Sequence, residues 1–211
     1  MSKGSQLPKK YRVDQLVGSQ SMASLAAKLQ AIQRTTNCNA FIVVSPSQLD
    51  GKTSVAVSLA IEYAHSGSKV ALVQANPFET ENYFDVATGE GLADLLAVPI
   101  EAASTTSAFQ TTNVEGLQFL PFGTVDGQAL TGDQISRFPR LLELLDSEFD
   151  LVLFDGPAMD EGSVGTALSL SVGAALIVVR RNHSKTPDAD AMADTFKSID
   201  VDVVGVVSLE G

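Results

Sequence analysis

The residues best suited to chemistry stand in one stretch, from Ala40 to Ala60, which reads AFIVVSPSQLDGKTSVAVSLA. An apolar run, Phe41 to Val44, precedes a short polar segment, and a helical pattern opens at Lys52 and Thr53. Backbone N–H groups at a helix N-terminus attract anions, and Gly-Lys-[Ser/Thr] ends a phosphate-binding loop in which the lysine reaches phosphates and the hydroxyl holds Mg²⁺. Pro46 stands where the full motif has its first glycine, so a ligand-free strand, turn and helix stays an alternative.

Further polar residues follow two other apolar runs. The segment KVALV (69–73) leads into Gln74-Ala75-Asn76-Pro77, and LVLF (151–154) is closed by Asp155 before Gly-Pro. Ligands of parallel sheets bind at the carboxyl ends of strands, so we expect Gln74, Asn76, Asp155 and the phosphate loop at one edge. An acid after an apolar strand is typical of a Mg²⁺ site, although Asp before Gly-Pro is also good turn chemistry.

The elements that must position these residues alternate along the chain. Apolar runs predict strands at 41–44, 69–73, 117–121, 151–154, 174–179 and 201–207. An apolar stripe and helix start signals predict helices at about 22–32, 52–67, 82–87, 91–97, from Pro139 in a first turn, and from Thr186. The strands are continuously apolar rather than alternating, which indicates a mostly parallel sheet covered on both faces, a three-layer α/β/α fold. The segment 104–115 is hard to assign.

Composition and charge narrow the possible functions. The 211 residues are 45% hydrophobic and 18% charged with a formal net charge of -11, which disfavours nucleic-acid binding. We read residues 1–18 as a flexible N-terminal arm and 19–211 as a single domain. Cys38 is the only cysteine, and its expected role is that of a small buried hydrophobe. With no signal peptide and no apolar run long enough to cross a bilayer, we expect a cytoplasmic protein without direct membrane insertion.

The chain resembles the cytoplasmic domain of the bacterial tyrosine kinases of capsular and exopolysaccharide biosynthesis. These kinases belong with the septum-site and plasmid-partition ATPases to the deviant-Walker P-loop NTPases. The kinase pattern Ser-x-x-Pro-Gly-Glu/Asp-Gly-Lys-[Ser/Thr] is matched by Ser45 to Thr53, SPSQLDGKT. The later phrases GLADLLA, VEGLQFLPFG, FPRLLELLDSEFDLVLFDGPA, ALIVVR and VVGVV also match in order and spacing, so the resemblance covers about residues 20–208.

The resemblance implies a P-loop NTPase fold that binds ATP or ADP with Mg²⁺. The metal would be held by Thr53 and Asp155. Ser208 stands where the kinases have an adenine-side asparagine after the last strand. The implied nucleotide contacts are Ser47, Gln48, Leu49, Asp50, Gly51, Lys52, Thr53, Ser54 and Ser208.

Departures from the kinase pattern cluster at positions of function. The loop proline and glycine are Gln48 and Leu49, and leucine has no easy access to positive φ. The family's Val-Asp-x-Asp aspartates are Gln74 and Asn76, and an amide cannot take a proton from a tyrosine hydroxyl at neutral pH. We therefore expect tyrosine phosphotransfer to be lost, with weak Mg-ATP binding retained. Neutral, tolerated changes stay an alternative.

Two other kinase features have no clear counterpart. The Glu-x-x-Arg-x-x-Arg oligomerisation motif is reduced to Gln20, Ala23 and Ala26. The family's tyrosine-rich tail is not found before Gly211, and the tyrosines present are Tyr11, Tyr63 and Tyr83. We expect Tyr63 to be a core or rim residue.

We expect a degenerate kinase acting as a regulator or scaffold of exopolysaccharide synthesis and export. Its implied partner is a membrane polysaccharide co-polymerase, the chain-length determinant protein, which would place it at the inner membrane; homo-oligomer formation stays open. The alternatives are an active ATPase of the septum or partition class, a residual tyrosine autokinase, and a nucleotide-free interaction module. The basic cluster Arg180, Arg181 and Lys185 is expected to form a solvated strand-end loop, and contact with a phosphate or an acidic partner stays the alternative.

Overall fold

The computed structural model describes residues 13–36, 38–79, 81, 83–86, 89–100, 105–124, 128–184 and 186–210. Within these ranges strands and helices alternate along the chain, as the sequence predicts. The strands are β1 (Ala40–Val44), β2 (Val70–Gln74), β3 (Gln110–Thr111), β4 (Leu117–Leu120), β5 (Leu151–Asp155), β6 (Ala174–Arg180) and β7 (Asp202–Leu209). The helices are α1 (Val13–Leu16), α2 (Gln20–Thr36), α3 (Lys52–His65), α4 (Leu92–Ala97), α5 (Thr105–Ala108), α6 (Gly132–Glu148), the 3₁₀ helix η2 (Met159–Glu161), α7 (Val164–Val172) and α8 (Thr186–Ser198).

The strands form one sheet in the order β3-β4-β2-β5-β1-β6-β7. Every pairing is parallel except that of the short edge strand β3 with β4. The register places Val43 of β1 and Gln74 of β2 beside Asp155 of β5. The predicted mostly parallel sheet is therefore confirmed, and the polar residues that follow its strands meet at one edge.

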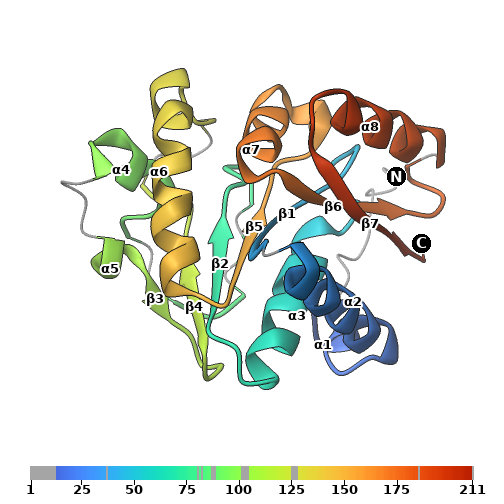
Figure 1. Ribbon diagram of the computed structural model, residues 1–211, viewed down its shortest axis with the longest axis horizontal. Helices are drawn as coiled ribbons and strands as arrows, with labels where there is room; N and C mark the ends of the chain where they lie inside the picture. The colour runs from blue at the N-terminus through green and yellow to red at the C-terminus, as the bar shows by residue number, and fades with distance from the viewer. Residues whose placement is uncertain are drawn as a thin grey trace, which may run out of the picture.

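Helices cover both faces of this sheet and give it two cores (Figure 1). On one face α1, α2 and α3 pack against β1, β2 and β5, with Met22, Leu29 and Tyr63 buried in that cluster. The other face is covered by α4, α6, α7 and α8, and its core contains Ile42 and Phe154. There α6 packs on β5, α7 on β1 and β6, and α8 on β6 and β7. This three-layer arrangement is the predicted α/β/α fold, and Tyr63 is a core residue. Across the part of the chain described here, none of the helices is long and apolar enough to cross a bilayer.

The start of α6 differs from the sequence prediction. Pro139 was expected in a first turn, but the helix begins seven residues earlier, at Gly132, and Pro139 lies in its interior. Thr131 caps the helix: the Gln134 N–H donates to Thr131 Oγ1 at 3.4 Å, and the Thr131 N–H donates to Gln134 Oε1 at 2.8 Å. This reciprocal capping box fixes the first turn. Pro139 has no N–H to donate to the helix, and burial of its neighbours Phe138 and Leu141 offsets the lost hydrogen bond.

Other segments also depart from expectation. Instead of the predicted helix at 82–87, Tyr83 and Phe84 form a turn, while residues 82, 87 and 88 lie outside the described ranges. Residues 13–18, placed in the flexible arm, form α1 and pack on α3, where Glu62 accepts a hydrogen bond from the Gly18 N–H. Cys38 is half-buried, and its thiol donates to Ala40 O at 3.3 Å. The helix α7 and the edge strand β3 had not been predicted.

We predict that Gly91→Ala destabilises the fold by about 1–3 kcal/mol, the usual cost of overpacking. A Cβ at Gly91 would lie 2.2 Å from Pro121 O and 2.5 Å from Gly123 N, both backbone atoms that cannot turn away. The matched control is Gly89→Ala, since a Cβ there meets nothing within 4 Å. Chemical denaturation of both variants checks this, and equal midpoints would contradict it.

Candidate functional site

The loop after β1 is shaped by hydrogen bonds within itself and to the loop after β5. Ser45 Oγ donates to Ser47 O at 2.7 Å, and the Ser47 N–H donates to Asp50 Oδ2 at 3.2 Å. The Met159 N–H donates to Ser45 O at 2.9 Å. The loop is thus closed on one side by its own side chains and on the other by the segment that follows Asp155.

Asp50 is the fully buried anchor of this loop. Besides the Ser47 N–H, its carboxylate receives the Ser184 hydroxyl, and His183 Nδ1 lies 2.8 Å from its Oδ1. A buried carboxylate is costly unless it is hydrogen-bonded, and these partners offset that cost. They also fasten the phosphate loop to the loop after β6. The sequence had placed Asp50 at the ligand, and no motif had pointed to His183 or Ser184.

Two residues of the loop have left-handed backbones. Leu49 has φ of 65° and Gly51 has φ of 91°. For glycine this conformation has no steric cost, whereas for a residue with Cβ it costs about 1–2 kcal/mol. The expected difficulty at Leu49 is therefore accommodated rather than avoided: the loop holds the left-handed turn, and the Leu49 side chain is left 41% exposed beside the cavity.

The start of α3 brings a cation, a hydroxyl and a carboxylate together. Lys52, Thr53 and Asp155 are all buried, and Thr53 Oγ1 donates to Asp155 Oδ1 at 3.2 Å. This contact joins the first turn of α3 to the carboxyl end of β5, as the sequence predicts for a Mg²⁺-binding pair. Backbone N–H groups in the first turn of a helix are available to an anion, and Lys52 lies beside them.

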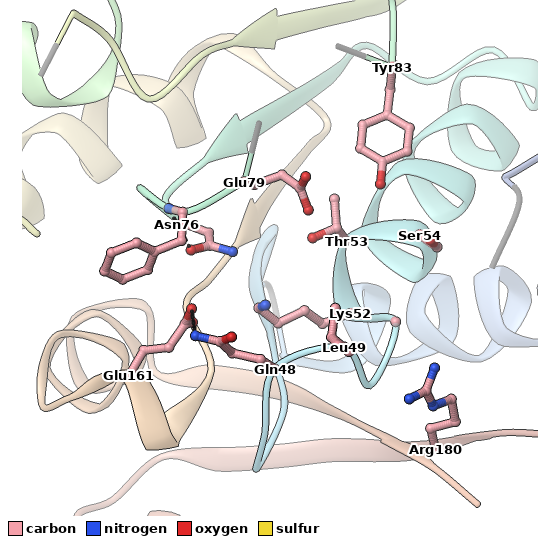
Figure 2. A pocket seen from close by; sticks show the side chains of 12 residues that line it. Gln48, Leu49, Lys52, Thr53, Ser54, Asn76, Glu79, Tyr83, Glu161 and Arg180 are labelled. Carbon is pink, nitrogen blue, oxygen red and sulfur yellow. Dashed lines mark hydrogen bonds between the residues drawn. The ribbon is translucent and has the colours of Figure 1, made fainter. Parts of the chain in front are cut away.

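Above these residues lies an open cavity of about 630 Å³ (Figure 2). Of the predicted site residues, those that line it are Gln48, Leu49, Gly51, Lys52, Thr53, Ser54 and Asn76. Ser47, Asp50 and Asp155 instead support the loop and the helix start around the cavity. Ser208 does not line the cavity; it is exposed on β7, where it pairs with Val179.

The two amides after β2 differ in position. Asn76 lines the cavity, and its Oδ1 accepts the Phe78 N–H at 3.1 Å. Gln74 lies at the strand end, but its amide donates to Glu79 O at 2.7 Å. Glu79 itself lines the cavity together with Lys52, and the sequence motifs had not indicated this acid.

Four further side chains line the cavity: Phe78, Tyr83 and Glu161, which the sequence did not indicate as site residues, and Arg180. The expectation of a solvated loop is wrong for Arg180, which ends β6 beside Leu209 of β7 and is only 8% exposed; its place in the cavity lining is the one expected of a phosphate contact. Its neighbour Arg181 is exposed as predicted, and Lys185 lies outside the described residues. Two cations, Lys52 and Arg180, therefore face the cavity (Figure 2).

Glu161 braces the loop from the side of η2. Its Oε1 accepts Gln48 Nε2 at 2.9 Å, and its Oε2 accepts the Ala158 N–H at 2.5 Å. Tyr83 enters from the opposite side, and burial raises the pKa of its phenol well above the usual value, with smaller contributions from Glu81, Glu79 and Asp155. The phenol therefore keeps its proton and is a donor at neutral pH.

The donor set fits a nucleotide phosphate with Mg²⁺. Glycine in the left-handed region, a buried lysine, and a hydroxyl bonded to a carboxylate are the parts such a site needs. Within the described residues no group of three His, Cys, Asp or Glu side chains forms a metal cluster on its own. Mg²⁺ is usually held by one or two carboxylates together with substrate phosphates and water.

Fold and site together define a P-loop NTPase of the septum-site ATPase and bacterial tyrosine kinase type. Residues 49–186 match the family described as "Cellulose biosynthesis protein BcsQ", and the chain belongs to this family. The kinase resemblance is also confirmed. The "Putative tyrosine-protein kinase EpsB" of Ralstonia solanacearum is 28% identical over 193 residues, which cover 89% of this chain and 25% of that protein. The chain thus spans about a quarter of the length of the curated relatives it matches.

Solved structures agree on the fold. The kinase domain of Escherichia coli tyrosine kinase ETK is 20% identical with a TM-score of 0.78, covering 100% of this chain and 84% of that one. The cell division ATPase MinD of Pyrococcus furiosus is 24% identical with a TM-score of 0.67, covering 80% of this chain and 70% of that one.

We predict that Leu49→Gly is more stable than Leu49→Ala by about 1 kcal/mol. Both changes remove the leucine side chain beyond Cβ, and only the glycine also removes the Cβ that opposes φ of 65°. Elsewhere glycine is normally the less stable of the two, so the order of the two unfolding midpoints is diagnostic. An alanine variant as stable as the glycine variant would mean that this turn is not held left-handed.

Proposed function

We propose that this chain is a Mg-nucleotide-binding regulatory component of a polysaccharide synthesis and export system, with little or no tyrosine phosphotransfer. The observation that carries the proposal is that the phosphate- and metal-binding residues are retained while the proton-accepting residues are not. The arrangement of Lys52, Thr53 and Asp155 is kept, whereas amides stand at 74 and 76, where the kinases have aspartates.

Binding of ATP or ADP would use both cations and the helix start. Lys52 and the N–H groups of the first turn of α3 would hold the β-phosphate, and Arg180 faces the same cavity. Thr53 and Asp155 would hold Mg²⁺, which neutralises phosphate charge when bound. Whether Ser208 reaches the adenine stays a prediction.

The loss of phosphotransfer follows from the chemistry of Asn76. Its Oδ1 accepts the Phe78 N–H, so it acts as a turn former, and an amide cannot accept a proton at neutral pH. Deleting a general base typically costs about 10²–10⁴-fold in rate. Nucleotide occupancy, rather than phosphate transfer to tyrosine, is then the property that a partner would sense.

The proposed setting follows the relatives. The family is named for cellulose biosynthesis, and relatives of this chain are named as tyrosine-protein kinases, one of them in a cps region. We place the protein in the cytoplasm, at the inner membrane through a membrane polysaccharide co-polymerase, with homo-oligomer formation open. The net charge of -11 argues against nucleic acid as a partner.

ATP hydrolysis is the second candidate function. The likeness to MinD supports the fold of an ATPase, and Glu79 and Glu161 place carboxylates in the cavity. Phosphate release from ATP at a rate above that of a Lys52→Ala variant would favour this candidate over a purely regulatory role.

We predict that Lys52→Ala weakens ADP binding by about 10–100-fold in calorimetric titration. A hydrogen bond to a charged group contributes about 1.5–3 kcal/mol, and about 1.4 kcal/mol is tenfold in affinity. The control is Arg181→Ala, which removes an exposed cation one residue from Arg180 and should bind as the wild type does. Equal heats for wild type and Lys52→Ala would place the ligand elsewhere. A wild type that saturating Mg-ATP fails to stabilise against heat would be a nucleotide-free module.

We also predict that the purified protein incorporates no radiolabel from γ-labelled ATP into tyrosine. The reason is the absence of a carboxylate base at 74 and 76. An active kinase domain of a bacterial tyrosine kinase serves as the positive control under the same conditions. Labelled Tyr11, Tyr63 or Tyr83 in the wild type, and not in Lys52→Ala, would overturn the degenerate assignment.

A further inference from the structure

In the turn after β2 the carboxylate stands at Glu79, whereas positions 74 and 76 are amides. Asn76 Oδ1 accepts the Phe78 N–H at 3.1 Å, and Asn76 O accepts the Glu79 N–H at 3.4 Å. Gln74 Nε2 donates to Glu79 O at 2.7 Å. Both amides that replaced the family's aspartates therefore hold the turn on which Glu79 stands.

This role requires an amide at position 74. A carboxylate there would be acceptor-only and could not donate to the Glu79 carbonyl oxygen. It would also place a second negative charge close to the Glu79 side chain, and like charges repel. The amide of Gln74 and the position of Glu79 are thus physically linked in this chain.

The Glu79 side chain is directed to the metal side of the cavity. Figure 2 shows its carboxylate pointing toward Thr53, on the far side of the cavity from Arg180. The Glu81 N–H donates to Glu79 Oε1 at 3.0 Å, which steadies the side chain without using up the four acceptor positions of a carboxylate. Thr53 in turn donates to Asp155 Oδ1 at 3.2 Å, so the hydroxyl toward which Glu79 points is already bonded to the acid at the end of β5.

Two other observations agree with this placement. The negative charges of Glu81, Glu79 and Asp155 all raise the pKa of the Tyr83 phenol, so Glu79 and Asp155 both lie within electrostatic range of that group. Glu161, the other acid that lines the cavity, has both oxygens hydrogen-bonded, one to Gln48 of the phosphate loop and one to the Ala158 N–H at the start of η2. Glu161 is thus a brace, and Glu79 is the acid directed at the hydroxyl.

We infer that Glu79 supplies the Mg²⁺-side carboxylate that the end of β2 lacks, acting on the metal directly or through a bound water. This inference rests on the proposed nucleotide site and deepens it. Together with Thr53 and Asp155 it gives the site the one or two carboxylates that Mg²⁺ usually takes from protein. It leaves Asn76 without a proton-accepting role, so metal binding is retained where tyrosine phosphotransfer is not.

The test compares ADP affinity with and without Mg²⁺ by calorimetry in wild type, Glu79→Gln and Glu79→Asp. Without metal, Glu79→Gln should bind ADP at least as tightly as the wild type, since a negative charge near the phosphates is gone. The gain in affinity on adding Mg²⁺ should fall by about tenfold or more, the usual cost of losing a metal-orienting group. Glu79→Asp keeps the charge and should recover part of the gain.

The matched control is Glu115→Gln, which removes the same charge from an exposed residue just before β4, at the opposite edge of the sheet, and should leave the Mg²⁺ gain unchanged. Circular dichroism of each variant verifies folding. A wild-type Mg²⁺ gain in Glu79→Gln would refute the inference and leave the nucleotide site standing. A wild-type protein that binds no ADP under either condition would refute the proposed function and the inference with it.

Discussion

Four buried charged side chains at the carboxyl edge of the sheet constrain the loops around them. Asp50, Lys52, Asp155 and Arg180 are each less than a tenth exposed. Burying an ionised group is costly unless hydrogen bonds or an opposite charge offset it, so the surrounding loops must deliver donors. Asp50 receives them from its own loop and from the loop after β6, and Asp155 receives the Thr53 hydroxyl. The two cations border the cavity, where the anion of the proposed ligand would offset their charge.

The sheet makes this concentration of charge possible. The strands β1, β2, β5 and β6 are adjacent and parallel, so four chain segments distant in sequence end at one edge. Both faces are covered by helices, which leaves that edge as the place where polar groups meet. A parallel sheet of this kind explains how a 20% identical kinase domain and a 24% identical ATPase can share the fold.

Much of this could be predicted from the sequence, because continuous apolar runs and Gly-Lys-Thr are local patterns. What could not be predicted depends on contacts between distant segments. Arg180 is buried at the end of β6 beside Leu209 of β7, which the composition of its own loop does not reveal. Glu79 lines the cavity from a turn in which the side chains of Gln74 and Asn76 form hydrogen bonds. The start of α6 could have been predicted locally, because Thr131 and Gln134 have the spacing of a capping box, a stronger signal for the helix start than Pro139.

The contacts of Asp50 with His183 and Ser184 have a mechanical consequence. The phosphate loop and the segment that leads into α8 share one carboxylate that solvent does not reach. Moving one segment without the other would leave the buried Asp50 carboxylate without these hydrogen-bond partners, which is energetically costly. We therefore expect the two loops to move together, so that a partner docking on residues 181–184 would act on the phosphate loop through Asp50 rather than across the cavity.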